Sequence, residues 1–230
     1  MAKVQQGRQK DWCRHLTAAA TASLLLGSAQ AQFFTPSFQN YQSFAQRSVG
    51  YVAATIKPEF TAQAVRQALK PPAIPVKYKY ALSRTDFAFK GRPTQQKNCA
   101  AMVTKPSDQQ QMAQVCLQLF NAAQTIPELR KNNLAAGLTL LISLSLQVQT
   151  GAELTSTEID ALQRGLNDVL VDTGVMQGKP GDIQAMYETS VMTGALIIGI
   201  AQNGADDGNA DLTNTAKTLA AIVLKGMKLN

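Results

Sequence analysis

Histidine and tryptophan are almost absent from this 230-residue chain, which has one of each, His15 and Trp12. Both lie in the first 31 residues, a segment with the features of a cleavable export signal. Removal of that segment leaves no imidazole side chain. Serine and cysteine nucleophiles activated by histidine are then excluded, as are zinc and haem sites with histidine ligands. An enzyme of this composition would need carboxylates, lysine, tyrosine or a metal held by oxygen ligands.

The first 31 residues have the three parts of a secretory signal. Basic side chains precede an uncharged stretch, residues 16–28, and an A-x-A cleavage site at 29–31 comes before Gln32. The apolar run is shorter than the roughly 20 residues that span a bilayer. No cysteine follows the cut and no arginine pair precedes the apolar run, so neither lipidation nor twin-arginine export is indicated. The pattern predicts a signal peptide at 1–31 and a location in the periplasm or the medium.

Cysteine is also scarce, because loss of Cys13 with the signal peptide leaves only Cys99 and Cys116. An even pair in an oxidising compartment usually forms a disulfide. Such a bridge would close a loop of about 18 residues and stabilise the fold by roughly 3 kcal/mol. The alternative is a pair of buried free thiols that pack as small apolar groups. We predict the disulfide.

Charge and proline divide the remaining chain near residue 106. Residues 32–106 hold eleven basic and two acidic residues, whereas residues 107–230 hold seven basic and twelve acidic residues. Eight of the nine prolines lie at or before Pro127. The division predicts a basic, proline-containing arm at 32–106, followed by a helical domain at 107–230.

The arm has few regular patterns. Aromatic residues after Gln32 are expected to dock on the protein's own core, or else to form a sticky surface for a partner. Residues 59–69 are bounded by prolines and predict a short helix. Residues 76–90 begin with an alternating pattern that is typical of an extended stretch or one short strand. Residues 91–106 have the composition of a loop.

Beyond residue 107, apolar residues recur every three or four positions, which predicts about five main helices. The fourth, from about residue 182 to 202, is apolar nearly all round at its second half, so it is expected at the centre of the bundle and is too short to span a membrane. Expected cap residues are Ser107 and Asp108, Asn132 or Asn133, the Thr155–Glu158 capping box, and Asp211, with Gly151 as a stop. The fold class is therefore all-α, a single helical domain with an irregular N-terminal arm.

Three stretches give the helical part a family resemblance. They are NNLAAGLTLLISLSLQVQTG (132–151), GDIQAMYETSVMTGALIIGIAQ (181–202) and TNTAKTLAAIVLKGM (213–227). From about residue 106 onward, the chain resembles a family of exported bacterial proteins of unknown function. The resemblance implies a helical fold and export, and it implies no activity.

Glu188, beside Tyr187, is the leading candidate for a functional residue. It lies where an otherwise apolar helix face begins, and burial there would require a hydrogen-bond donor. Asn132 and Asn133 are expected partners if the two helices pack together. These four residues could form the floor of a ligand pocket, with Glu188 as an acid–base group. The favoured alternative is a structural contact that fixes helix register or caps a neighbouring helix.

No cofactor or metal site is predicted. The loop at 203–211 is rich in oxygen ligands but lacks the spacing of a calcium-binding loop, and a solvated turn before the last helix is favoured. The glycine-containing stretch at 174–181 lacks a preceding strand, and Lys179 is followed by proline, so it does not fit a phosphate-binding loop.

The segment 76–105 combines cations with tyrosine and phenylalanine, a composition that can bind polyanions. Its candidate contact residues are Lys77, Lys79, Arg84, Lys90, Arg92 and Lys97. The alternative is a strip that complements the acidic helical half of the same protein. Export makes intracellular nucleic acid an unsuitable partner, and leaves envelope proteins or anionic polymers.

Three functions follow from these patterns. The first is a non-catalytic interaction or structural protein of the bacterial envelope. The second is a carboxylate-based enzyme that uses Glu188 in a polar pocket. The third is a polyanion-binding module that uses residues 76–105. A filled core around Glu188 would favour the first over the second.

Overall fold

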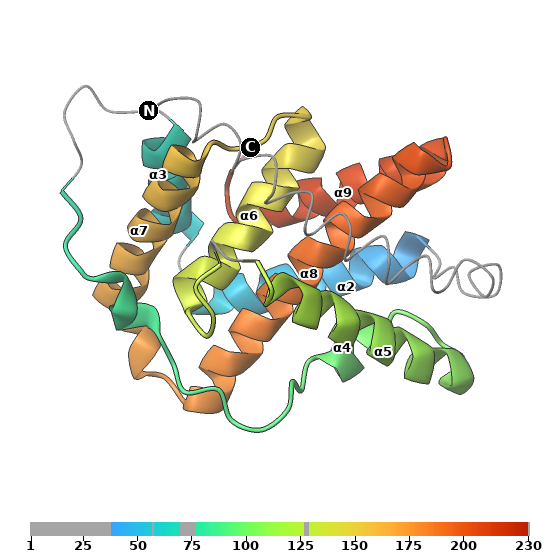
Figure 1. Cartoon of the computed structure of the whole chain (residues 1–230), viewed down its shortest axis with the longest axis horizontal. Helices are drawn as coiled ribbons and strands as arrows, with labels where there is room; N and C mark the ends of the chain where they lie inside the picture. The colour runs from blue at the N-terminus through green and yellow to red at the C-terminus, as the bar shows by residue number, and fades with distance from the viewer. Residues whose placement is uncertain (1–37, 57, 70–76, 127–128, 230) are drawn as a thin grey trace.

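The computed structural model describes residues 38–56, 58–69, 77–126 and 129–229, and within them the protein is all-α, with eight α-helices and no strand (Figure 1). The predicted signal peptide and its cleavage site lie outside the described residues. The helices are α2 (Phe38–Thr55), α3 (Pro58–Leu69), α4 (Gln96–Ala100), α5 (Pro106–Ala123), α6 (Leu134–Thr150), α7 (Ser156–Asp172), α8 (Pro180–Asp206) and α9 (Ala210–Gly226), with 3₁₀ helices at Leu82–Thr85 and Val175–Gln177. The predicted fold class is confirmed.

Helices α6 and α8 form the centre of the molecule, with α2, α5, α7 and α9 packed around them and α3 against α7 (Figure 1). Every residue of α6 from Leu134 to Ser145 is buried. Helix α8 is longer than expected, at 27 residues, and is apolar enough to cross a membrane by length and composition. However, 94% of its most apolar window is buried inside the fold. Its place in the core therefore accounts for its apolar composition, as predicted for the central helix.

The two central helices approach closely because glycine lies at their contact. A Cβ atom built on Gly194 of α8 would lie 3.1 Å from the Cα atom of Leu141 in α6. A Cβ atom on Gly137 of α6 would lie 2.6 Å from the ring of Tyr187 in α8. Neither position has room for a side chain, so the two glycines set the distance between the helices.

We therefore predict that Gly194→Val lowers the free energy of unfolding by about 2 kcal/mol, because the added methyl groups overlap the α6 backbone. Urea unfolding of the wild type and the variant measures this change. Gly50→Val in α2 is the matched control, since no atom of another described element lies within 4 Å of its added Cβ. Equal stability of the two variants would contradict the close contact between Gly194 and the α6 backbone.

Several predicted caps are present and others are replaced. The Asn133 side chain caps α6, Thr155 and Glu158 form the capping box of α7, and Gly151 ends α6 in the left-handed conformation. Ser107 and Asp108 do not cap α5, which begins one residue earlier with Pro106 and has no side-chain cap. The cap of α9 is Asn209, whose side chain accepts hydrogen bonds from the N–H groups of Asp211 and Leu212. The prediction that Asp211 caps this helix was therefore wrong.

The arm is more regular than its composition indicated. Residues 38–55 form α2, where an irregular segment was expected, and the predicted helix at 59–69 is confirmed as α3. Tyr41 and Phe44 of α2 are buried in the common core, which fits the docking interpretation of the aromatic cluster. No strand forms between residues 77 and 90, because only one isolated bridge, Asp86 to Asn133, pairs this segment with another. The expected loop at 91–106 contains the short helix α4.

Candidate functional site: a groove between α2, α4 and α8

Glu188 is fully buried, and both of its carboxylate oxygens are hydrogen-bonded. Its Oε2 atom accepts from the main-chain N–H groups of Thr94 and Gln95, at 2.7 and 2.9 Å, and from the Thr94 hydroxyl at 3.3 Å. Its Oε1 atom accepts from the Gln184 side chain at 2.8 Å. The carboxylate thus fastens the residues that lead into α4, which agrees with the structural interpretation of Glu188.

Gln184 extends this connection along the chain. Its side-chain amide donates to the carbonyl of Lys90 and accepts from the N–H of the same residue. Gln184 and Glu188 lie one helical turn apart on α8 and share one face. Together they hold the segment from Lys90 to Gln95 against the central helix.

Asn132 and Asn133 are not the partners of Glu188, contrary to expectation. The Asn133 side chain instead donates to the carbonyl of Leu82, the hydroxyl of Thr85 and the carboxylate of Asp86, at 2.8 to 2.9 Å. Asn132 adopts a left-handed conformation, and its carbonyl accepts from the N–H of Phe87. The asparagine pair therefore anchors a different part of the same segment, residues 82–87.

Asn167 of α7 completes this second anchor. It is fully buried, accepts from the hydroxyl of Thr85 at 2.9 Å and donates to the carbonyls of Tyr80 and Ala81. Residues 80–87 are thus bound to α6 through Asn133 and to α7 through Asn167. This role of Asn167 could not be predicted from local sequence patterns, because the residues that it contacts are more than 80 positions away.

Tyr187 lies inside an aromatic cluster with Phe87, Phe89 and Phe120. Its hydroxyl exchanges hydrogen bonds with the side chain of Gln124 at the end of α5. Burial raises the pKa of Tyr187, and hydrogen bonds from Gln124 and from the backbone of Asn132 act in the opposite direction. Tyr187 is fully buried and packs the core, so it does not face a ligand pocket.

The predicted disulfide is present between Cys99 of α4 and Cys116 of α5, which are 17 positions apart in the sequence. Both are fully buried. Helix α4 is therefore held at its start by Glu188 and near its end by a covalent bond. One exposed side of α4 forms the wall of a groove.

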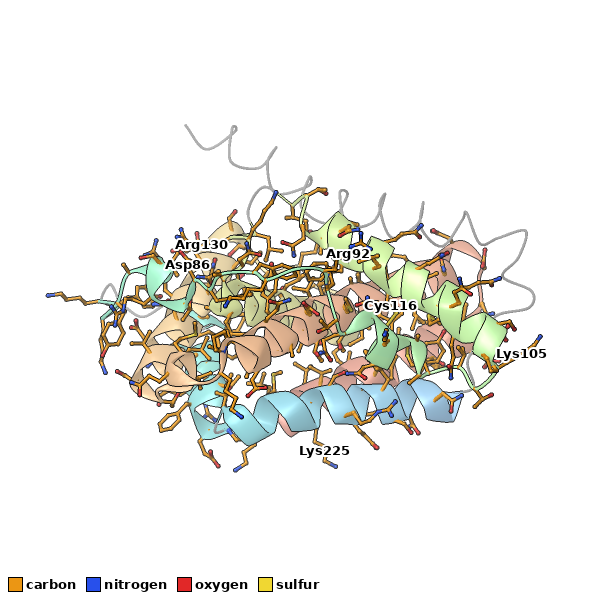
Figure 2. The ribbon with its side chains drawn as sticks, turned by 90° about the horizontal axis from the view of Figure 1, so that it is seen from below. Asp86, Arg92, Lys105, Cys116, Arg130 and Lys225 are labelled. Carbon is orange, nitrogen blue, oxygen red and sulfur yellow. A yellow bond between two sulfur atoms is a disulfide. The ribbon has the colours of Figure 1, made fainter. Side chains whose placement is uncertain are left out.

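The groove has a volume of about 520 Å³ and lies between α2, α4 and the first half of α8. In Figure 2, α5 and α4 lie above α2, and α8 runs between them. Most of the side chains that line the groove are uncharged, with one cation and one acid among them. They include Phe44, Arg47, Gln95, Asn98, Asp182 and Met192. Thr94 and Gln95, which hydrogen-bond to Glu188, separate the buried carboxylate from this space.

The basic segment is partly occupied by contacts within the protein. Lys79 forms an ion pair with Asp172 of α7 at 2.6 Å, and the N–H groups of Lys79 and Tyr80 donate to Asp168. These contacts support the interpretation that the segment complements the acidic helices. Five of the six predicted polyanion-binding side chains are exposed and form no ion pair within the described part of the chain: Lys77, Arg84, Lys90, Arg92 and Lys97.

Arg130 and Asp86 form an ion pair beside the Asn133 anchor (Figure 2). The hydrogen bond from Arg130 is the main cause that lowers the pKa of Asp86 below its usual 3.8, and Asn133 acts in the same direction. Because the folded-state pKa is lowered, this stabilisation is present above pH 3.8 and is lost as the pH falls through the folded value.

We therefore expect Arg130→Gln to lower stability at neutral pH by at most about 1 kcal/mol, since both side chains are partly exposed. Because the pKa of Asp86 is lowered, the difference from the wild type should be smaller at about pH 2 than at pH 7. Urea unfolding at the two pH values measures it. Arg84→Gln removes an exposed charge that has no ion-pair partner among the described residues, and it should behave like the wild type at both pH values. A loss of stability in Arg130→Gln that is the same at both pH values would contradict the ion pair.

Among the described residues, no group of three His, Cys, Asp or Glu side chains is placed to hold a metal ion. The oxygen-rich loop before α9 is shorter than predicted, because residues 203–206 belong to α8. What remains is a two-residue turn followed by the Asn209 cap.

The fold and the site define a disulfide-bonded, all-α protein in which the buried carboxylate at the centre of the site serves a structural contact. The chain belongs to a family of unknown function, DUF6683, which it matches over residues 15–230. The resemblance was based on the helical part from about residue 106 onward, whereas the family match also covers the arm. No curated protein and no solved structure matches the chain.

Proposed function

We propose that this chain is an exported protein of the bacterial envelope that acts by binding a protein partner, without catalysis. Residues 1–31 would be its signal peptide, and residues 32–230 the working protein. The observation that carries the proposal is the environment of Glu188. Its four hydrogen-bond donors occupy both oxygens, and no face of the carboxylate is exposed.

A carboxylate enzyme would need Glu188 to reach a substrate. A general acid or base must come within hydrogen-bonding distance of the reacting proton. Thr94 and Gln95 occupy the position between Glu188 and the groove. The arrangement thus favours binding over acid–base chemistry by this residue.

The proposal is tested by isolating the protein from its native host. We expect it in the periplasmic or secreted fraction, with an N-terminal sequence that begins at Gln32. Recovery of the uncut chain from the cytosol would overturn both the export and the envelope role. In that case the reducing cytosol would also leave Cys99 and Cys116 accessible to thiol labelling after unfolding.

Polyanion binding is a second candidate, supported by the exposed cations of the segment 84–97. Charge-driven binding should appear as retention on heparin that is lost at moderate salt. The variant Arg92→Glu should then elute earlier than the matched variant Lys225→Glu, which makes the same change of charge on the opposite side of the molecule (Figure 2). Passage of the wild type through heparin at low salt would exclude this candidate.

A further inference from the structure

We propose that the groove between α2, α4 and α8 binds an extended peptide segment of the protein partner, with the amides of Gln95 and Asn98 pairing with its backbone. This inference rests on the proposed function and specifies its site and ligand class. The groove has a volume of about 520 Å³, which lies within the range of ligand sites in proteins.

The two amides are oriented by a chain of hydrogen bonds that starts at Glu188. A carboxylate only accepts, so the Thr94 hydroxyl donates to it at 3.3 Å. The Gln95 amide then donates to the Thr94 oxygen at 3.1 Å, and the Asn98 amide donates to the Gln95 oxygen at 2.6 Å. Each contact fixes the orientation of the next side-chain amide, that is, which position holds its oxygen and which its nitrogen. Successive hydrogen bonds also strengthen one another.

This series of hydrogen bonds leaves donor and acceptor groups free for a ligand. Asn98 is exposed, and its Oδ1 atom accepts no hydrogen bond from the described residues. One acceptor and the remaining N–H bonds of the two amides therefore face solvent at the wall of the groove. A peptide unit offers one N–H donor and one C=O acceptor, which matches a side-chain amide of fixed orientation.

The other side chains of the groove disfavour different ligands. One cation, Arg47, and one acid, Asp182, line it, so it has no excess charge to attract a polyanion. Its aromatic residue, Phe44, is only 5% exposed and cannot present a ring face for a sugar to stack on. A backbone segment with small uncharged side chains fits this lining best.

Gly181 provides a way to fill the groove without disturbing the core. It lines the groove, and no atom of the other described elements lies within 4 Å of a Cβ atom built on it. Gly181→Phe should therefore fold normally and place its ring in the space that a ligand would use.

The test uses the purified protein as its host produces it, with a phage-displayed library of random peptides of about 12 residues as the probe. Peptides that bind the wild type are measured by calorimetry against three variants. We expect Asn98→Leu to weaken binding at least about tenfold, because two hydrogen bonds are lost. Gly181→Phe should abolish it. Asn214→Leu, an exposed asparagine on α9, is the matched control and should bind within about twofold of the wild type.

Thermal unfolding checks that all three variants fold. Selection of no peptide, or equal binding by Asn98→Leu and Asn214→Leu, would overturn the peptide groove while leaving the proposed function intact. Binding of an N-acetylglucosamine oligosaccharide that Gly181→Phe blocks would overturn the peptide class. Recovery of the bound peptide in cleaved form would instead overturn the proposed function.

Discussion

Replacing Glu188 with leucine is expected to lower the free energy of unfolding by about 3 kcal/mol or more. The substitution leaves the N–H groups of Thr94 and Gln95 and the side chain of Gln184 without their acceptor. A polar group that loses its partner in a buried site costs roughly 1–3 kcal/mol. Urea unfolding of the two proteins measures the difference directly.

Two further variants show whether the effect comes from these contacts. Glu188→Gln keeps the shape of the side chain. Both positions of the carboxylate face hydrogen-bond donors, so the N–H₂ group of the amide opposes a donor in either orientation. We therefore expect an intermediate loss of about 1–2 kcal/mol. Glu153→Leu removes an exposed glutamate in the connection between α6 and α7 and should change stability by less than about 0.5 kcal/mol. A stable Glu188→Leu variant would show that the carboxylate does not fasten the segment.

Loss of the disulfide is expected to have an effect of similar size. Replacement of Cys99 and Cys116 together by alanine should reduce the free energy of unfolding by about 3 kcal/mol, because the unfolded chain regains the freedom of the closed loop. Both sulfur atoms are buried, so the lost packing adds to the entropic term. Reduction of the wild type by dithiothreitol should produce a loss in the same direction.

The double alanine variant also provides the control for the reductant. Dithiothreitol should leave its unfolding curve unchanged, since it has no bond left to reduce. If the wild type and the double variant unfold at the same urea concentration without reductant, the bridge does not stabilise the protein. Within the proposed function, the bridge and Glu188 fix the two ends of α4, so each change should also weaken peptide binding.

The helical half was predictable because its signals are local. Thr155 and Glu158 form a capping box from residues three apart, and the periodic apolar residues of α6 to α9 produce the expected helices. The arm was harder to predict, because its structure depends on contacts with distant helices. Residues 82–87 take their conformation from Asn133 and Asn167, which follow them by about 50 and 80 positions.

The candidate site shows the same limit. The sequence favoured a structural contact for Glu188 over a ligand pocket, and it predicted the disulfide between the two cysteines. It named the wrong partners, since nothing local connects Glu188 with Thr94 and Gln95, 94 and 93 residues earlier. Gln184 was overlooked, although its place one turn before Glu188 on the same helix face was a usable signal.

The most direct test of the account is amide hydrogen exchange at Thr94 and Gln95, measured by NMR on the native protein. Because both N–H groups donate to a buried carboxylate, we predict exchange at least about 100-fold slower than in an unfolded chain. In Glu188→Leu, protection at these two amides should fall well below that of the α6 and α8 backbone. Exchange of both amides at the unfolded rate in the wild type would contradict the fixed wall on which the binding groove depends.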